Sequence, residues 1–337
     1  MNTLKLGIIG AGRIGKLHAR NLKHQVPGAE LSAVADIYEE PIRELAEELE
    51  IPKVSTDYRE ILEEPEIDGV VICTSTDTHA RIISEAADKG KHVFCEKPIA
   101  LKMDKIDRAL EAVDKAGVKL AVGFNRRYDP SFKKARELVA AGEIGQPYLV
   151  KITSRDPEPP SLDYIKISGG IFLDMTIHDF DMARYLLDQE VTEIMATGAC
   201  LVNQEIAQYD DVDTAITNLK YESGALGVID NCRETAYGYD NRIEVFGSEG
   251  SVAVGHKKPT EVMVQNEKGI TGDKPLYFFT ERYQEAYVAE MEDFVKVVVE
   301  NRRPLANGQD GKIAVQMGYA AGESLAKGKF VKVENNV

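Results

Sequence analysis

A glycine pattern near the start of the chain constrains the fold more than any other feature. The letters G-A-G-R-I-G at residues 10–15 lie between a short apolar run, residues 4–9, and a helix-like segment. In a strand–turn–helix unit, Gly10 permits the tight turn, Gly12 leaves the backbone open to a ligand, and Gly15 lets helix and strand pack closely. The N-terminus of such a helix offers N–H groups to phosphates. The pattern therefore predicts a dinucleotide-binding turn.

The first 125 residues alternate between strand-like and helix-like segments. Apolar strand-like runs occupy residues 4–9, 31–35, 69–74, 92–95 and 119–123. Helix-like segments occupy residues 13–24, 39–50, 78–89 and 103–116. Regular alternation of this kind predicts a parallel sheet with helices on both faces. We therefore expect an α/β Rossmann domain over residues 1–124.

The rhythm changes after Phe124. Helix-like segments follow at residues 131–141, 174–187, 283–301 and 312–327. Strand-like segments follow at residues 194–202, 213–221, 225–232, 242–246 and 251–254, separated by turn signals. These predict an α+β domain over residues 125–337 with an open, mostly antiparallel sheet. Helices can cover one face of that sheet, and a partner subunit would cover the other, so we expect a homo-oligomer.

Bulk properties exclude several classes of protein. A chain of 337 residues exceeds what one core usually supports, which agrees with two domains. A net charge of −15 without any basic run argues against nucleic acid and anionic membrane surfaces as partners. No apolar stretch approaches the roughly 18–20 residues of a spanning helix, and we see no signal peptide. We expect a soluble, cytoplasmic protein whose four scattered cysteines are reduced core thiols.

An acidic residue follows the second predicted strand. Asp36 lies 21 residues after Gly15, where a carboxylate should accept hydrogen bonds from the hydroxyls of the adenosine ribose. The same carboxylate would repel a 2′-phosphate, and the next residues, Ile37 and Tyr38, supply no arginine to hold one. NAD is therefore favoured over NADP. The alternative is a structural glycine turn followed by a surface aspartate.

Two further segments lie at the carboxyl ends of predicted strands, where ligands bind in such sheets. The third strand ends in T-S-T-D-T-H, residues 74–79, which we expect along the nicotinamide half of the cofactor; Asp77 or Thr78 is equally well explained as a helix cap. Glu96-Lys97-Pro98 follows the fourth strand. Lys97 can hold a substrate oxygen and stabilise developing charge, or it is an ordinary exposed loop lysine. Pro98 suits a tight bend and a cis bond.

The second half of the chain carries one polar cluster that suits acid–base chemistry. In G-G-I-F-L-D-M-T-I-H-D, residues 169–179, Asp174 and His178 are four residues apart and would share one face of a helix. A histidine suits proton abstraction near neutral pH, and Asp174 can orient it or bind a substrate hydroxyl. The alternatives are a core histidine, a capping aspartate, or two metal ligands. We expect no metal, because no third ligand lies at a recognisable spacing.

Taken in order and spacing, these motifs resemble the glucose–fructose oxidoreductase/inositol dehydrogenase family. The resemblance covers nearly the whole chain. Residues 170–184, G-I-F-L-D-M-T-I-H-D-F-D-M-A-R, and residues 123–130, G-F-N-R-R-Y-D-P, are most similar to inositol dehydrogenases of that family. The first three motifs identify the family, and these two segments favour inositol as the substrate, although related sugar dehydrogenases share much of the pattern.

The resemblance implies an activity and a set of site residues. The activity is oxidation of a ring hydroxyl of myo-inositol to 2-keto-myo-inositol (scyllo-inosose), with transfer of hydride to NAD. The catalytic residues would be Lys97, Asp174 and His178, with His178 as the general base. The cofactor residues would be Gly10, Gly12, Arg13, Ile14, Gly15, Asp36, Thr74, Ser75, His79, Glu96 and Lys97. The substrate residues would be Lys97, Arg127, Asp156, Asp174, His178 and Tyr237.

The resemblance also implies a homotetramer built through the open sheets. Arg155-Asp156 stands where some relatives carry Arg-Asn, and a carboxylate at Asp156 can still accept polyol hydroxyls. Three alternatives stay open: an NAD-dependent dehydrogenase of scyllo-inositol or a hexose, an NAD-requiring glycoside hydrolase, and an NAD-binding sensor without catalysis. The presence of Lys97, Asp174 and His178 together argues against the sensor.

Overall fold

The computed structural model describes residues 3–334, which form two compact units. The first unit contains residues 3–128 and returns for Glu285–Ile313. The second contains Asp129–Gln284 and residues 314–334. None of the helices within residues 3–334 combines the length and apolar character that a bilayer span requires.

The first unit is built on a six-stranded parallel sheet in the order β3-β2-β1-β4-β5-β6. Its strands are β1 (Leu4–Ile9), β2 (Ala29–Ala35), β3 (Lys53–Ser55), β4 (Gly69–Ile72), β5 (His92–Cys95) and β6 (Leu120–Val122). Its helices are α1 (Arg13–His24), α2 (Glu39–Leu49), α3 (Tyr58–Leu62), α4 (Thr76–Asp88), α5 (Met103–Ala116), the 3-10 turn η1 (Asn125–Tyr128) and α11 (Gln284–Val299). The predicted Rossmann fold is confirmed, and the strand order reverses between β1 and β4, where such sheets bind ligands.

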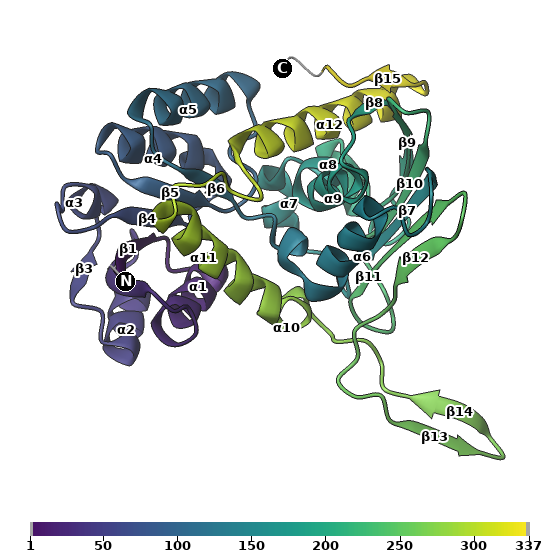
Figure 1. Ribbon diagram of the computed structural model, residues 1–337, viewed down its shortest axis with the longest axis horizontal. Coiled ribbons are helices and arrows are strands. Elements are labelled where there is room, and N and C mark those ends of the chain that lie inside the picture. Colours follow the sequence, from purple (N-terminus) through teal and green to yellow (C-terminus); the bar gives the residue numbers. More distant parts are fainter. Residues whose placement is uncertain (1–2, 335–337) are drawn as a thin grey trace. The chain divides into compact units, whose positions relative to one another are not determined.

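Helices cover both faces of this sheet, with α4 and α5 on one face and α1, α2 and α11 on the other (Figure 1). The sequence analysis assigned the α11 segment to the second domain. In the structure its apolar face, Met291, Phe294 and Val295, packs into the same core as Leu6 and Phe94 of the sheet. An amphipathic helix can cover either of two apolar surfaces, and the local pattern does not say which one.

The second unit is built on a seven-stranded mixed sheet in the order β12-β11-β7-β10-β9-β8-β15. Its strands are β7 (Pro147–Arg155), β8 (Val191–Ala199), β9 (Thr214–Tyr221), β10 (Leu226–Cys232), β11 (Asp240–Gly247), β12 (Ser251–Val254) and β15 (Val331–Lys332), with β13 (Met263–Asn266) and β14 (Gly269–Gly272) as a separate hairpin. Only β7 and β10 run parallel, so the predicted mostly antiparallel sheet is confirmed. The central strand β7 was missed.

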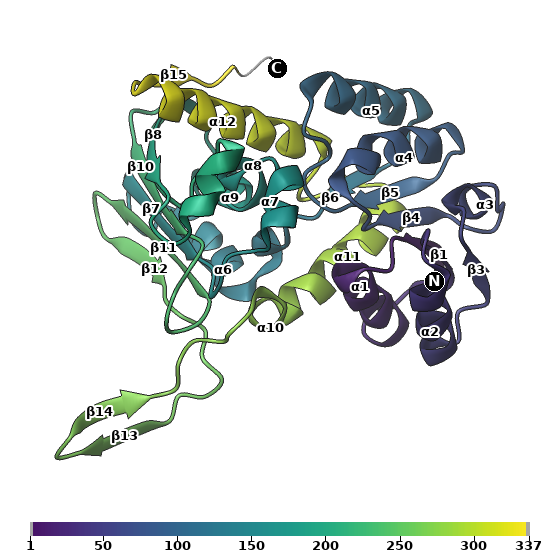
Figure 2. The same cartoon turned by 180° about the vertical axis from the view of Figure 1, so that it is seen from behind.

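Helices cover one face of the second sheet and leave the other open (Figure 2). The helices of this unit are α6 (Pro130–Ala140), α7 (Leu162–Ser168), α8 (Ile171–Asp174), α9 (Ile177–Leu187), η2 (Gln204–Tyr209), α10 (Phe279–Arg282) and most of α12 (Gly308–Lys327). On the open face, Phe246, Leu149 and Leu226 pair across three adjacent strands, each between 39% and 52% exposed. We call this row of three side chains the open-face row.

Candidate active site

The glycine turn of the first unit has the geometry that its sequence predicts. Gly10 has a positive φ of 99°, and a Cβ atom there would lie 2.6 Å from the backbone of Cys73. A Cβ on Gly15 would lie 1.8 Å from the carbonyl oxygen of Gly10. A Cβ on Gly12 would meet nothing within 4 Å, and no side chain caps the start of α1 at this residue. The helix N-terminus is therefore open to a phosphate, as binding of a dinucleotide requires.

Asp36 closes the other side of this turn. Its Oδ2 accepts a hydrogen bond from the backbone N–H of Ala11 at 2.7 Å, and its Oδ1 accepts one from Tyr38 N–H at 3.0 Å. These two bonds fix the carboxylate at the end of β2, beside the glycine turn. A carboxylate oxygen has more than one lone pair, so Asp36 can still accept hydrogen bonds from ribose hydroxyls. Its role toward NAD stays a prediction.

The segment after β4 is tied to the segment after β5 by one histidine. His79 is 1% exposed, and its two ring nitrogens lie 2.9 Å from the carbonyl oxygen of Pro98 and 3.0 Å from that of Thr74. Burial lowers the pKa of His79. A neutral imidazole has one N–H and donates to one carbonyl at a time. His79 therefore lies between the loop that follows β4 and the loop that follows β5, and it hydrogen-bonds to their backbone carbonyls.

Helix α4 begins earlier than the sequence predicts, so the two capping alternatives change. Ser75 is the N-cap residue, and neither Asp77 nor Thr78 precedes the helix. The hydroxyl of Thr78 donates to the carbonyl of Ser75 at 2.8 Å and lies 2.6 Å from the hydroxyl of Thr74. The helix-cap interpretation of Asp77 and Thr78 is therefore wrong, because both lie within the first turn.

The Glu96-Lys97-Pro98 turn leaves the carboxyl end of β5. The peptide between Lys97 and Pro98 is cis, which the sequence analysis anticipated. The N–H of Glu96 donates to the carbonyl of Ile72 on β4 at 3.0 Å. The carboxylate of Glu96 lies 2.8 Å from His18 Nε2, in the interior of the first unit. Lys97 is partly exposed and belongs to the first unit, whereas Asp174 and His178 belong to the second.

The prediction that Asp174 and His178 lie on one regular helix is wrong. Asp174 ends α8 and His178 lies in the first turn of α9, with an irregular step at Met175 and Thr176 between them. The buried Thr176 explains the break, because its hydroxyl donates to Asn231 Oδ1 of β10 at 2.7 Å. That bond fixes the step against the sheet and interrupts the regular helical spacing.

Two side chains that the sequence analysis missed hold Asp174. The hydroxyl of Tyr164 donates to Asp174 Oδ1 at 2.9 Å, and Arg233 Nη1 donates to Asp174 Oδ2 at 3.1 Å. The Arg233 side chain is 1% exposed and also lies 3.9 Å from Asp211. Burial and the Asp174 carboxylate raise the pKa of Tyr164, so it stays a donor. Asp174 is thus fixed as an acceptor of two hydrogen bonds.

Helix α9 carries His178 against the same sheet. Asp179 and Asn231 are both fully buried, and Asn231 Nδ2 donates to Asp179 Oδ2 at 2.9 Å. Together with the bond from Thr176, this anchors the start of α9 to β10. The His178 side chain itself is partly exposed. The anchor therefore places the imidazole on a rigid helix start, as positioning of a general base requires.

Asp156 and Tyr237 lie at one end of the second sheet. Asp156 follows β7, and its N–H donates to the carbonyl of Cys232 at the end of β10. The hydroxyl of Tyr237 donates to Asp240 Oδ2 at 2.7 Å and accepts from Arg155 Nη1 at 3.3 Å. Strands β7 and β10 run parallel, so their carboxyl ends lie at the same edge of the sheet. Asp156 and Tyr237 follow these two strands, and Arg233 lies directly after β10 at the same edge.

The Tyr237 hydroxyl is held by a charged network. Burial alone would raise the pKa of Asp240, but hydrogen bonds from Arg242 and Tyr237 outweigh it and lower the pKa. Arg155 forms a two-pronged ion pair with Asp230 on β10. The two residues that bond to the Tyr237 hydroxyl, Arg155 and Asp240, are themselves held by ion pairs. The network therefore fixes the direction of that hydroxyl.

Arg127 has a structural role in the first unit. Its Nη1 donates to the carbonyl of Leu305 at 2.6 Å, and its Nη2 lies 3.1 Å from Asp310 Oδ1. The side chain is 7% exposed. These contacts fasten η1 to the start of α12, and a contact between Arg127 and substrate stays a prediction.

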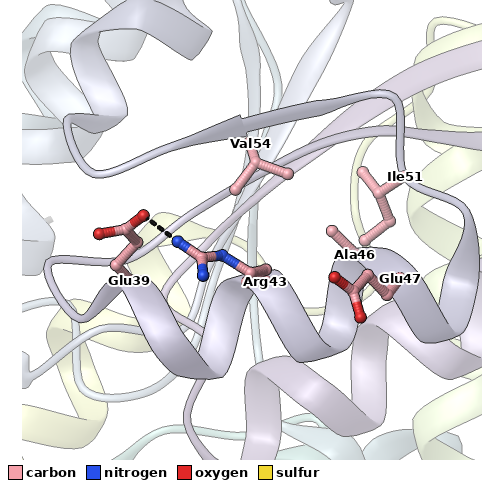
Figure 3. Close-up of a pocket in the computed structure, with 6 residues that line it drawn as sticks. All are labelled: Glu39, Arg43, Ala46, Glu47, Ile51 and Val54. Atoms are coloured by element: carbon pink, nitrogen blue, oxygen red, sulfur yellow. Dashed lines mark hydrogen bonds and ion pairs between the residues drawn. The ribbon is translucent and has the colours of Figure 1, made fainter.

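One surface hollow of the first unit is lined by none of these residues. It measures about 470 Å³ and is shown in Figure 3, where Arg43 reaches toward Glu39 along α2. The lining residues are Glu39, Arg43, Ala46, Glu47, Ile51 and Val54. None of them is a predicted cofactor residue, so the hollow is not the candidate site.

Three groups in the first unit lie close enough to suggest a metal site: His18, Glu96 and Glu290. The 2.8 Å between His18 Nε2 and Glu96 Oε1 is a hydrogen-bond distance. Two ligands on one tetrahedral metal, each about 2.0–2.1 Å from it, lie about 3.3 Å apart. The cluster therefore has the geometry of a hydrogen-bonded group rather than of a metal centre.

Two family models match the chain. Residues 4–124 match an oxidoreductase family with an NAD-binding Rossmann fold, and residues 132–253 match the GFO/IDH/MocA C-terminal domain. Myo-inositol 2-dehydrogenase of Thermotoga maritima is 50% identical over 98% of this chain and 99% of the relative. The scyllo-inositol 2-dehydrogenase (NAD(+)) of Bacillus subtilis is 40% identical over 98% of this chain and 96% of the relative.

Solved structures agree over the full chain. A myo-inositol dehydrogenase from Corynebacterium glutamicum superposes with a TM-score of 0.94 at 40% identity, covering 98% of this chain and 99% of the other. A scyllo-inositol dehydrogenase from Lactobacillus casei with bound NAD(H) and scyllo-inositol has a TM-score of 0.92 at 29% identity, with the same coverage. The matches confirm NAD as the cofactor. This chain therefore belongs to the GFO/IDH/MocA family of oxidoreductases, and its first unit is the family's NAD-binding Rossmann domain.

Proposed function

We propose that this protein oxidises a ring hydroxyl of myo-inositol to 2-keto-myo-inositol (scyllo-inosose). The observation that carries the proposal is the sheet end of the second unit, where Asp156, Tyr237 and the neighbourhood of Asp174 meet. Carboxylates and a phenol hydroxyl are the groups that bind the several hydroxyls of a polyol. Full-length relatives named as inositol 2-dehydrogenases support the same substrate class.

The chemistry follows from the residues. Oxidation of an alcohol releases a proton from the hydroxyl and a hydride from its carbon, and NAD, when bound, supplies the hydride acceptor. His178 would accept the proton, because an imidazole titrates near neutral pH. Asp174, held in place by Arg233 and Tyr164, would orient the imidazole or accept a second hydroxyl. Lys97 would donate to the reacting oxygen and stabilise its developing negative charge.

The second candidate is oxidation of scyllo-inositol by the same residues. It is favoured by the 40% identical relative that carries that name and by the solved structure that holds NAD(H) with scyllo-inositol. The two isomers differ at one ring carbon, so a few hydroxyl contacts decide between them. A hexose dehydrogenase and an NAD-requiring glycoside hydrolase are further outcomes of the test below.

A screen for NADH release separates these functions. Purified protein is mixed with NAD and, in turn, myo-inositol, scyllo-inositol, chiro-inositol and common hexoses, and the absorbance of NADH is followed. We expect steady NADH production with myo-inositol as the best substrate. Faster turnover of scyllo-inositol or a hexose would identify that compound, rather than myo-inositol, as the substrate. A glycoside hydrolase would cleave a chromogenic glycoside without net NADH, and that result would overturn the dehydrogenase proposal.

We also propose a homotetramer formed through the open-face row. Three apolar side chains exposed next to one another on a sheet face are typical of a surface that a partner covers. The test is the mass of the assembly in solution, measured by light scattering after size-exclusion chromatography. We expect Phe246→Glu to reduce the mass and Lys151→Glu, exposed on the same face, to change it less. A Phe246→Glu variant of unchanged mass would contradict the proposal.

A further inference from the structure

A buried cluster of ionisable side chains lies behind the cofactor edge of the first unit. His18 comes from α1, Glu96 follows β5, and Glu290 comes from α11. His18 Nε2 lies 2.8 Å from Glu96 Oε1 and 3.8 Å from Glu290 Oε1. The side chains of His18 and Glu290 are 0% exposed, and that of Glu96 is 15% exposed. Three segments far apart in the sequence therefore place ionisable groups together in the core.

The surroundings of the cluster are mostly apolar, and no lysine or arginine within residues 3–334 forms an ion pair with Glu96 or Glu290. The ring of His18 packs edge-on against Phe94 and Tyr287, with centroids 5.4 Å and 5.7 Å away. Cys73, Cys95, His79 and Tyr128 are other titratable groups near one or both of the two carboxyls. Within residues 3–334, neither carboxylate oxygen of Glu290 has a hydrogen-bond partner closer than the 3.8 Å contact to His18. The cluster must therefore balance its own charge.

One proton kept on Glu290 balances this charge at the lowest cost. Two carboxylates buried side by side repel each other, and each pays for the loss of its hydration. In such a pair one carboxyl keeps its proton, because that proton removes one of the two charges. Burial, with a further contribution from the Glu96 carboxylate, raises the pKa of Glu290 well above its usual value. Burial raises the pKa values of Cys73 and Cys95 too, so both thiols stay neutral.

The position of Glu96 connects the cluster to the cofactor edge. Its backbone N–H bonds to Ile72 of β4, and the next residues are Lys97 and Pro98. Its carboxylate is confined on the other side by Gly123, where a Cβ atom would lie 2.8 Å from Glu96 Oε2. A shift of this carboxylate would therefore press on the backbone at Gly123 or on the turn that carries Lys97.

We propose that His18 and Glu290 are positioning residues: His18 bonds to the Glu96 carboxylate, Glu290 keeps its proton beside them, and together they fix the Glu96–Lys97–Pro98 turn for NAD. At high pH the proton leaves and two adjacent buried charges push Glu96 and the turn out of place. The inference rests on binding of NAD at this edge and on no particular polyol.

The first test is the pH dependence of NADH binding, followed by fluorescence from about pH 6 to about pH 9. Wild-type protein should lose affinity severalfold on the alkaline side. Glu290→Gln keeps the shape and cannot lose a proton, so its affinity should match the wild type near pH 7 and stay flat. Glu290→Leu removes the hydrogen-bonding atoms and should bind NADH severalfold more weakly at every pH. Glu292→Gln, on the partly exposed side of the same helix, is the matched control and should follow the wild type.

The second test is thermal unfolding of the same variants, and its sign is fixed by linkage. Unfolded Glu290 releases its proton near pH 4.3, whereas the folded protein keeps it. The wild type therefore loses stability relative to Glu290→Gln as pH rises above about 4.3, and the melting temperature of the variant should exceed that of the wild type by more at about pH 8 than at about pH 5. A merely structural glutamate would give the same difference at both pH values.

Direct observation of the proton completes the design. The infrared spectrum at about pH 8 should contain a carbonyl band of a protonated carboxylic acid that Glu290→Gln removes. Absence of that band, a flat wild-type binding profile, or a stoichiometric divalent metal that Glu290→Gln loses would each overturn the proposal. If wild-type protein binds NADH but oxidises no inositol, the proposed function fails while the cluster is tested independently.

Discussion

The two units build their polar edges in different ways. In the first unit the cofactor edge consists largely of backbone: a glycine turn, an open helix N-terminus, and carboxylates and a histidine bonded to backbone atoms. In the second unit the sheet end consists of charged side chains held by other charged side chains, such as Asp174 with Arg233 and Tyr237 with Asp240. One edge depends on local chain geometry, and the other on pairs brought together by the fold.

This difference predicts which substitutions each edge tolerates. A site made of backbone atoms loses its ligand when an added Cβ atom or the loss of a carboxylate changes the turn. The residues around the turn are then expected to move little. A site of buried charge pairs fails when one partner is removed, because the other is left without compensation. The predictions below test this contrast in order of expected effect.

The largest effect is expected from Arg233→Met. The change leaves Asp174 and Asp211 without their buried cation, and the free energy of unfolding should fall by about 3–5 kcal/mol. Chemical denaturation measures this loss, and kcat should fall with it. Lys220→Gln, which breaks the partly exposed pair with Glu193, is the control and should cost about 0–1 kcal/mol. Equal losses for the two variants would contradict a buried role for Arg233.

His178→Ala comes second. Removal of the general base should lower kcat roughly 100-fold or more, while the Kd for NADH stays near the wild-type value. Steady-state kinetics and NADH fluorescence give the two numbers. An unchanged kcat would show that His178 is not the general base. The start of α9 would then be explained by the buried contact between Asp179 and Asn231 alone.

The third effect concerns the backbone edge. Asp36→Ser should weaken NAD by about tenfold and relax the discrimination against NADP, because it removes a negative charge and acceptors for the ribose hydroxyls. Asp36→Asn keeps an acceptor for Tyr38 N–H but loses the charge and the acceptor for Ala11 N–H, so it should relax the discrimination against NADP and weaken NAD less than Asp36→Ser. Calorimetric titration with both nucleotides decides, and no change in NAD affinity would disprove the ribose assignment.

The smallest effect is a pH dependence of stability. Burial lowers the folded pKa of His79, so its contribution is fully present above the unfolded pKa of about 6.5 and is lost as pH falls below it. Between about pH 7 and about pH 6 the wild type should lose up to about 1 kcal/mol more than His79→Gln. Denaturation curves at both pH values measure this, and parallel losses would mean that His79 titrates normally.

The same contrast explains what the sequence could predict. The glycine turn, Asp36 and the β-α alternation are local, because a tight turn needs glycine wherever it occurs. Strand β7 was missed because its carboxyl-terminal part carries two consecutive polar residues, Thr153 and Ser154, that are buried in the fold but break the apolar alternation of a strand. Its place in the sheet depends on partners in β10 and β11.

The rest of the candidate site depends on contacts between distant residues. Arg233 and Asp174 are 59 positions apart, and nothing local to either residue predicts the pair. Thr176 breaks the helix between Asp174 and His178 through a bond to Asn231, 55 positions away. His18, Glu96 and Glu290 likewise come from three separate segments. One signal was available for Arg155 and Arg233, because each is a charged residue at or just after the end of a buried strand.

Hydride transfer from the inositol ring is the central claim, and isotope transfer tests it most directly. Myo-inositol carrying deuterium on the carbon of the 2-hydroxyl is oxidised with NAD, and the reduced cofactor is analysed by mass spectrometry. The account predicts deuterium in the nicotinamide ring and a 2-keto product. Unlabelled NADH would show that another carbon reacts, and no reduced cofactor at all would contradict the proposed oxidation of myo-inositol.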